Sequence, residues 1–136
     1  MKTKRFAVFV VAAAFLSVST PVFAHHGNSQ YDMQHSTAVT GTVTAFVWSN
    51  PHCILSFDTK DDSGAVKHWS VEMHNPILLT RAGWTSKSLK PGDEIQVTFH
   101  AAKNGSGSGQ LYGANAKISV HGTVLPLEIG ADTGAN

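Results

Sequence analysis

Apolar and polar residues alternate along most of the chain after residue 36, and this period of two constrains the fold most strongly. Successive side chains of a strand point to opposite faces, so each alternating segment predicts a strand with one buried face. Five segments alternate, and a short sixth can follow them: Thr37–Trp48, His52–Lys60, Ala65–Met73, Glu94–His100, Leu111–Val120 and Thr123–Leu127. The expected inward residues are Val39, Gly41, Val43, Ala45, Val47, Cys53, Leu55, Phe57, Trp69, Val71, Met73, Ile95, Val97 and Phe99.

One short helix is expected between the third and fourth strands. Asn75 is a favourable N-cap, and Pro76 suits the first helical turn. Gly83 follows the last turn in a left-handed cap position, from which Trp84 can pack back over Leu79. The sequence therefore predicts a helix that begins after Asn75 and ends before Gly83.

The order of three strands, one helix and two strands is that of an OB-type barrel. We therefore expect an all-β fold with one short helix, an OB-like antiparallel barrel of five to six strands. A barrel also removes exposed sheet edges, which otherwise promote aggregation. A small β-sandwich is the alternative.

The first 24 residues have the pattern of a cleavable signal peptide. A basic start precedes an apolar run from Phe6 to Val18 that is too short to span a bilayer comfortably, and Val22 and Ala24 form a small-residue cleavage site. The expected organisation is a signal peptide over 1–24, a flexible N-terminal arm over 25–36, a barrel over 37–128 and a disordered tail over 129–136. The segment "KNGSGSG" at 103–109 is expected to be a flexible loop. The expected location is the periplasm.

Charge and cysteine content narrow the class of function. The chain has 10 basic and 9 acidic residues, and loss of Lys2, Lys4 and Arg5 would leave a net charge of about −2. This argues against a nucleic-acid partner or electrostatic attachment to anionic lipid. Cys53 is the only cysteine, so no internal disulfide forms. Its inward position predicts a small buried hydrophobe rather than a nucleophile.

Several motifs resemble a family of small exported bacterial proteins that is known only as a domain of unknown function. They are a mature start with His-His, "TGTVTAFVWSNPHCILSFD", "WSVEM", "LLTRAGWTSKSLKPGDEIQVT" and "GANAKISV", and the Asn50-Pro51-His52 and "LKPGD" pieces are the most specific. The sequence departs from the expected pattern at His74-Asn75 and at Cys53. The resemblance implies an exported OB-like domain and implies no particular chemistry.

Cleavage after Ala24 would leave His25 as the first residue. Its free amine and ring Nδ1 can then close a six-membered chelate around one metal ion, since the amine loses its proton easily near neutral pH. A planar set of nitrogen ligands favours Cu(II), then Ni(II), whereas a tetrahedral set favours Zn(II). The candidates for a further ligand are His26, His35, His52, His68, His74, His100 and His121.

The expected strand pairing narrows the choice among these candidate ligands. In the hairpin of the second and third strands, His52 lies beside Glu72 or His74 in either plausible register, near the arrival of Trp48. The predicted site residues are therefore His25, His26, His52, His74 and Glu72, with Trp48 on the outward face as a stacking platform. A turn-bonding His52, a solvated Glu72–His74 pair and a packed Trp48 are the alternatives.

These observations favour an exported binding module that could hold a transition metal, copper preferred, through His25. The alternative is a metal-free OB-like domain that binds a small ligand or a periplasmic protein. An enzyme is not expected, and a copper oxidase or monooxygenase is the only form that such a site would permit.

Overall fold

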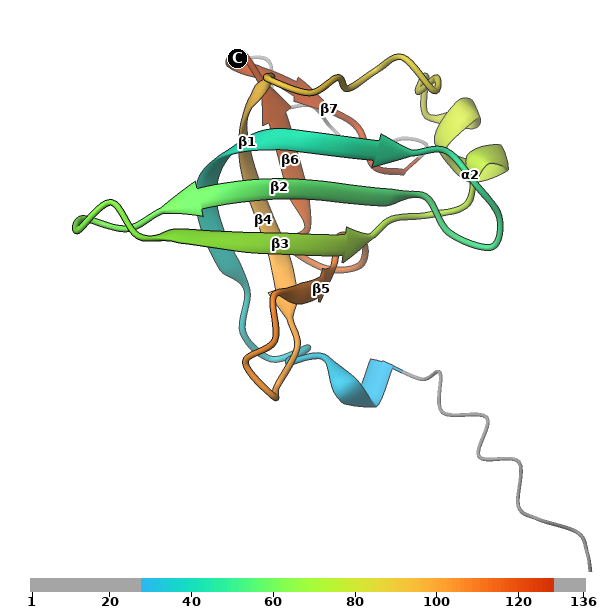
Figure 1. Ribbon diagram of the computed structural model, residues 1–136. Helices are drawn as coiled ribbons and strands as arrows, with labels where there is room; N and C mark the ends of the chain where they lie inside the picture. The colour runs from blue at the N-terminus through green and yellow to red at the C-terminus, as the bar shows by residue number, and fades with distance from the viewer. Residues whose placement is uncertain (1–27, 129–136) are drawn as a thin grey trace, which may run out of the picture.

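The structure is a computed structural model that describes residues 28–128. Seven strands, one 3-10 helix and one α-helix make up this part of the chain, and the strands curl around a single core (Figure 1). The elements are η1 (Asn28–Gln30), β1 (Thr37–Val47), β2 (Ile54–Lys60), β3 (Val66–Glu72), α2 (Pro76–Arg81), β4 (Glu94–Ala101), β5 (Ser108–Gln110), β6 (Lys117–Val120) and β7 (Thr123–Leu125). The predictions for residues 1–27 and 129–136, including the signal peptide, His25, His26 and the tail, lie outside the described residues.

Five strands close the barrel. They pair in the order β1-β2-β3-β5-β4, and β4 returns to β1 through an antiparallel ladder from Thr37 opposite Phe99 to Thr42 opposite Glu94. The predicted OB-like barrel is confirmed, and the sandwich alternative is wrong. The barrel is mixed rather than purely antiparallel, because β3 and β5 run parallel from Ser70 opposite Ser108. Strands β6 and β7 extend the sheet beyond β4.

A β-bulge in β1 changes which residues face the core. Val43 lies opposite Phe57, but Phe46 lies opposite Leu55, so the register shifts by one residue between Val43 and Ala45. The extra residue reverses the alternation beyond this point. Val47, predicted to face inward, is therefore 48% exposed. Phe46 and Trp48 pack against the core instead, so the prediction that Trp48 lies on the outward face is wrong.

The predicted fifth strand over Leu111–Val120 is also wrong in its bounds. Only Lys117–Val120 of this range forms a strand, β6, and a separate strand β5 (Ser108–Gln110) overlaps the end of the segment predicted to be a flexible loop. Two glycines at β5 allow close approach, because a Cβ on Gly107 would collide with the carbonyl oxygen of His68 and one on Gly109 would lie 2.5 Å from the Phe99 ring. These glycines are therefore packing positions rather than linker residues.

The helix cap follows the prediction closely. The Asn75 side chain accepts from the N–H of Leu78, and Pro76 opens α2. Beyond the helix, the N–H of Gly83 donates to Thr80 and the N–H of Trp84 donates to Leu79, which is a Schellman motif. Gly83 has φ +93, as this motif requires. The cap turns the chain so that Trp84 enters the core.

Residues 28–36, predicted to form a loose arm, lie against the barrel. Tyr31 is 5% exposed and forms a β-bridge with Ala102. The N–H of Asp32 donates to Ala101, and the N–H of Lys103 donates to Gln30. This part of the chain, which we call the N-terminal strap (residues 28–36), therefore lies against the C-terminal end of β4.

Candidate functional site

Two predicted site histidines lie at the same end of the β2–β3 hairpin. The regular ladder ends with Ile54 opposite Glu72; beyond it, the N–H of Met73 donates to the carbonyl oxygen of Cys53, and the N–H of Cys53 donates to that of His74. Met73 and His74 therefore both lie opposite Cys53, and His52 precedes this irregular pairing. The Nδ1 of His52 lies 3.1 Å from the carbonyl oxygen of Met73, so the backbone orients this ring.

Tyr112 joins both histidines, although no motif in the sequence singles it out. Its ring stacks on His74 with centroids 4.9 Å apart and on His52 with centroids 6.2 Å apart. Tyr112 comes from the segment after β5, which the parallel β3–β5 pairing brings beside Glu72. Gln110 and Tyr112 lie two residues apart, so an extended chain would place both on the same face. That spacing does not reveal which strand this segment pairs with. We call His52, Glu72, His74 and Tyr112 the histidine–tyrosine cluster.

Glu72 gives this cluster a negative charge next to two phenols. Burial raises the pKa of Tyr31, and the nearby Glu72 carboxylate raises it further. Burial also raises the pKa of Tyr112, again with a contribution from Glu72. Both phenols therefore stay protonated at neutral pH and can serve as hydrogen-bond donors. The shared effect of Glu72 also shows that the N-terminal strap reaches the neighbourhood of the cluster.

The cluster alone does not form a metal centre. Among residues 28–128, no group of three His, Cys, Asp or Glu side chains is arranged to hold a metal ion. The nearest additional partner of His74 is Glu128, with 3.6 Å between Nε2 and Oε1. A metal at this end of the barrel would need a ligand from beyond the described range, where His25 and His26 lie.

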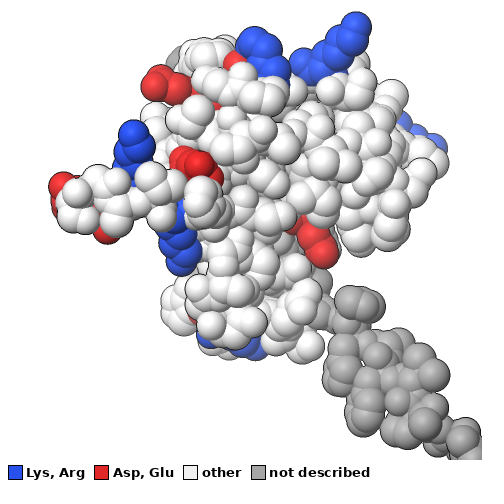
Figure 2. Space-filling view, in the orientation of Figure 1, with Lys and Arg blue, Asp and Glu red and all other residues white. Residues whose placement is uncertain are grey.

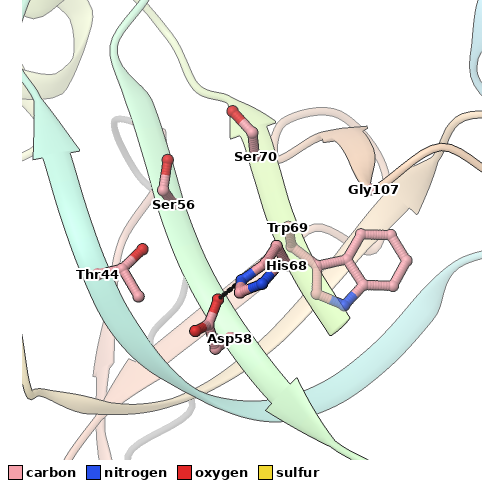
Figure 3. A pocket seen from close by; sticks show the side chains of 7 residues that line it. All are labelled: Thr44, Ser56, Asp58, His68, Trp69, Ser70 and Gly107. Atoms are coloured by element: carbon pink, nitrogen blue, oxygen red, sulfur yellow. Dashed lines mark hydrogen bonds and ion pairs between the residues drawn. The ribbon is translucent and has the colours of Figure 1, made fainter. Parts of the chain in front are cut away.

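A second feature is a shallow hollow of about 470 Å³ on the outside of β1, β2 and β3 (Figure 3). It is lined by Thr44, Ser56, Asp58, His68, Trp69, Ser70 and Gly107. Asp58 and His68 lie opposite each other, with 2.6 Å between Oδ1 and Nδ1. Three hydroxyl side chains stand beside this pair (Figure 3). The hollow was not among the predicted sites, and it lies beside the bulge at Thr44, which breaks the alternation there.

The other candidate ligands are occupied elsewhere in the fold. His35 bonds Asp32 on the N-terminal strap, and His121 lies 3.2 Å from the Asp93 carboxylate. Cys53 is fully buried, and burial raises the pKa of its thiol. His100 is buried against backbone carbonyl groups.

The face shown in Figure 2 has no broad patch of a single charge sign, because basic and acidic side chains are interspersed there. Within residues 28–128, no helix is both long and apolar enough to cross a membrane.

Comparison with known proteins identifies the kind of domain. Residues 13–114 match a family of unknown function (DUF6152), whose description assigns no activity. Neither a curated protein nor a solved structure matches the chain.

Proposed function

The chain belongs to this family of unknown function, and we propose that it is an exported periplasmic binding module that holds a divalent transition metal, with Cu(II) preferred. The metal would be held by the amine and ring Nδ1 of His25 after signal cleavage. A further imidazole would come from His26, His52 or His74. The role would be carriage, buffering or delivery of the metal rather than catalysis.

The observation that supports this proposal is the docking of the N-terminal strap. Tyr31 is buried beside β4, and its phenol is close enough to Glu72 to be affected by that carboxylate. His25 lies three peptide steps before Asn28, where η1 begins, a length of chain that can extend about 10 Å. The proposal requires that this length bring His25 to the histidine–tyrosine cluster. His52 and His74 would then add nitrogen ligands of the kind that copper prefers.

Copper titration of the chain that begins at His25 tests the proposal. The matched control carries one extra residue before His25, which destroys the chelate and leaves the barrel unchanged. We expect the control to bind Cu(II) at least about tenfold more weakly by calorimetry, with a different EPR signal. A second pair compares His52→Ala and His74→Ala with His68→Ala, which removes a histidine from the outer hollow.

If the chain that begins at His25 and the control with one extra residue bind Cu(II) equally tightly, the proposed His25 chelate is refuted. Mass spectrometry of the exported protein tests its premise, because any first residue other than His25 removes the proposed ligand.

The hollow on β1–β3 favours a second candidate function, a metal-free module that holds a small polar ligand or a partner. Its hydroxyl groups and the Asp58–His68 pair can donate and accept hydrogen bonds. Trp48 does not contribute a platform here, because it packs against the core. Absence of copper binding by the correctly processed chain would favour this second candidate.

A further inference from the structure

A row of hydroxyl side chains crosses the outside of the barrel over β1, β2, β3 and β5. Ser56 lies opposite Ser70, which in turn lies opposite Ser108. At the other end, Thr44 is the extra residue of the β1 bulge and lies beside Ser56 in the hollow (Figure 3). Neighbouring strands lie about 4.8 Å apart, so the row extends about 14 Å, a length comparable to that of a short oligosaccharide. We call Thr44, Ser56, Ser70 and Ser108 the hydroxyl row.

A carboxylate and an imidazole lie beside the hydroxyl row. Asp58 and His68 form the pair two residues from Ser56 and Ser70, with 2.6 Å between Oδ1 and Nδ1. This contact holds both side chains across the two strands (Figure 3). The His68 side chain is 81% exposed, and that of Asp58 is 31% exposed. Both groups are therefore accessible to a ligand in the hollow.

These polar side chains contribute little to the packing of the barrel. The residues between them on the same strands, Leu55, Phe57 and Val71, are fully buried and fill the core. Gly107 borders the hollow with backbone alone, and its carbonyl oxygen accepts from the N–H of Ser70 at 2.7 Å. The outer face thus presents hydroxyl, carboxylate and imidazole groups that the core does not require.

On the basis of the second candidate function, we propose that this hollow binds the hydroxyl groups of an uncharged saccharide. Each serine or threonine hydroxyl group can donate one hydrogen bond and accept others, and so can each hydroxyl group of a sugar. The two can therefore pair in either direction along the hydroxyl row. The Asp58 carboxylate has further lone pairs beyond the one that faces His68, and these can accept from a sugar hydroxyl group.

Charge makes other polar ligands less suitable. None of the residues that line the hollow is Lys or Arg, so a phosphate or carboxylate group would face Asp58 without a cation to balance it. A cationic ligand would meet a single carboxylate, which already contacts His68. An extended peptide binds along a free sheet edge, whereas the hollow lies over β2, which is paired on both edges.

NMR titration of the purified protein, in excess EDTA, tests the proposal without any contribution from a metal. The probes are maltotriose, cellotriose and triacetylchitotriose, which are uncharged and differ in linkage and substituents. We expect at least one of them to shift the backbone amides of Ser56, Asp58 and Ser70 in a saturable way. The Kd should lie in the millimolar range, because a shallow hollow buries little of its ligand. The amides of β6 should stay in place.

Three variants locate the binding. Ser70→Ala removes a hydroxyl group from the middle of the row and should weaken binding about three- to tenfold, as expected for one hydrogen bond. Asp58→Asn should weaken it about tenfold, because hydrogen bonds to a charged acceptor are stronger. Ser119→Ala is the matched control, since it removes a strand serine from β6, outside the hollow, and should leave the affinity unchanged.

The absence of a saturable shift with all three saccharides would overturn the proposal, and so would equal affinities of Ser70→Ala and Ser119→Ala. Spermidine, inorganic triphosphate and trialanine are titrated in parallel as probes of the other ligand classes. If one of these shifts the amides of the hollow and no saccharide does, the saccharide class is wrong and the metal-free binding module stands. If no probe of either set binds, that second candidate function fails too.

Discussion

Replacement of Gly109 by alanine tests whether the close approach of β5 builds this barrel. A Cβ at this position would lie 2.5 and 2.8 Å from two carbons of the Phe99 ring and 3.0 Å from the carbonyl oxygen of His100. Ordinary contacts begin near 3.4 Å, so the ring or the strand must move by almost an ångström. Phe99 has no free space, since it is fully buried between Trp69 and Phe57 at centroid distances of 4.9 and 5.9 Å. Overpacking of this kind costs about 1–3 kcal/mol, and we expect the upper end.

Urea unfolding followed by tryptophan fluorescence measures this cost. A loss of about 3 kcal/mol should lower the urea midpoint by roughly 1–3 M for a small domain. Gly64→Ala is the control, because Gly64 has φ +83 and an added methyl group would meet no atom within 4 Å. That change adds only backbone strain, about 1 kcal/mol. A Gly109→Ala protein that is as stable as Gly64→Ala would refute the argument that β5 is packed through its glycines.

Three further predictions concern other parts of the barrel. The Lys90 ammonium and N–H hold the pKa of Asp93 at about 2, so its contribution to stability is present above about pH 4 and is lost as the pH falls towards 2. Asp93→Asn should therefore flatten acid unfolding in that window, and an unchanged acid profile would contradict this. Burial raises the pKa of the Cys53 thiol, so a thiol reagent should label the native protein far more slowly than the urea-unfolded protein, and equal rates would show an open thiol. Because of the bulge, Phe46→Ala should cost about 2–4 kcal/mol in urea unfolding, whereas Val47→Ala should stay within about 0.5 kcal/mol. A larger loss of stability for Val47→Ala than for Phe46→Ala would instead indicate that the alternation continues unbroken through β1.

The parts of the fold that local sequence could predict are those fixed by neighbours along the chain. Alternation placed Leu55, Phe57 and Val71 in the core, and all three are fully buried. The helix was predicted equally well, because Asn75 and Gly83 act within one turn of its ends. The order of these elements was then sufficient to indicate the OB-like barrel.

The parts that local sequence could not predict depend on partners far away in the chain. Nothing local marks the bulge near Thr44, because it is defined by the residues opposite on β2. The segment "GSGSG" has the composition of a linker, and only the approach of His68 and Phe99 makes its glycines necessary. Tyr31 likewise sits in a polar stretch, and its burial results from a bridge to Ala102.

Several of these long-range contacts lie at the same end of the barrel as the candidate site. The sequence could therefore predict its histidines but not the residues that long-range contacts bring to it. His52 and His74 follow from a hairpin register, whereas Tyr112 and the strap arrive through the β3–β5 pairing and the bridge to Ala102. Gly109 is the common element, since its lack of a side chain lets β5 close against β4. Its replacement should therefore shift the NMR signals of Tyr112 and of the His100 ring, which lies opposite Gln110 of β5, as well as lower stability. Gly64→Ala, at the tip of the β2–β3 hairpin, should leave those signals in place, and an equal response to the two variants would show that the site does not depend on β5.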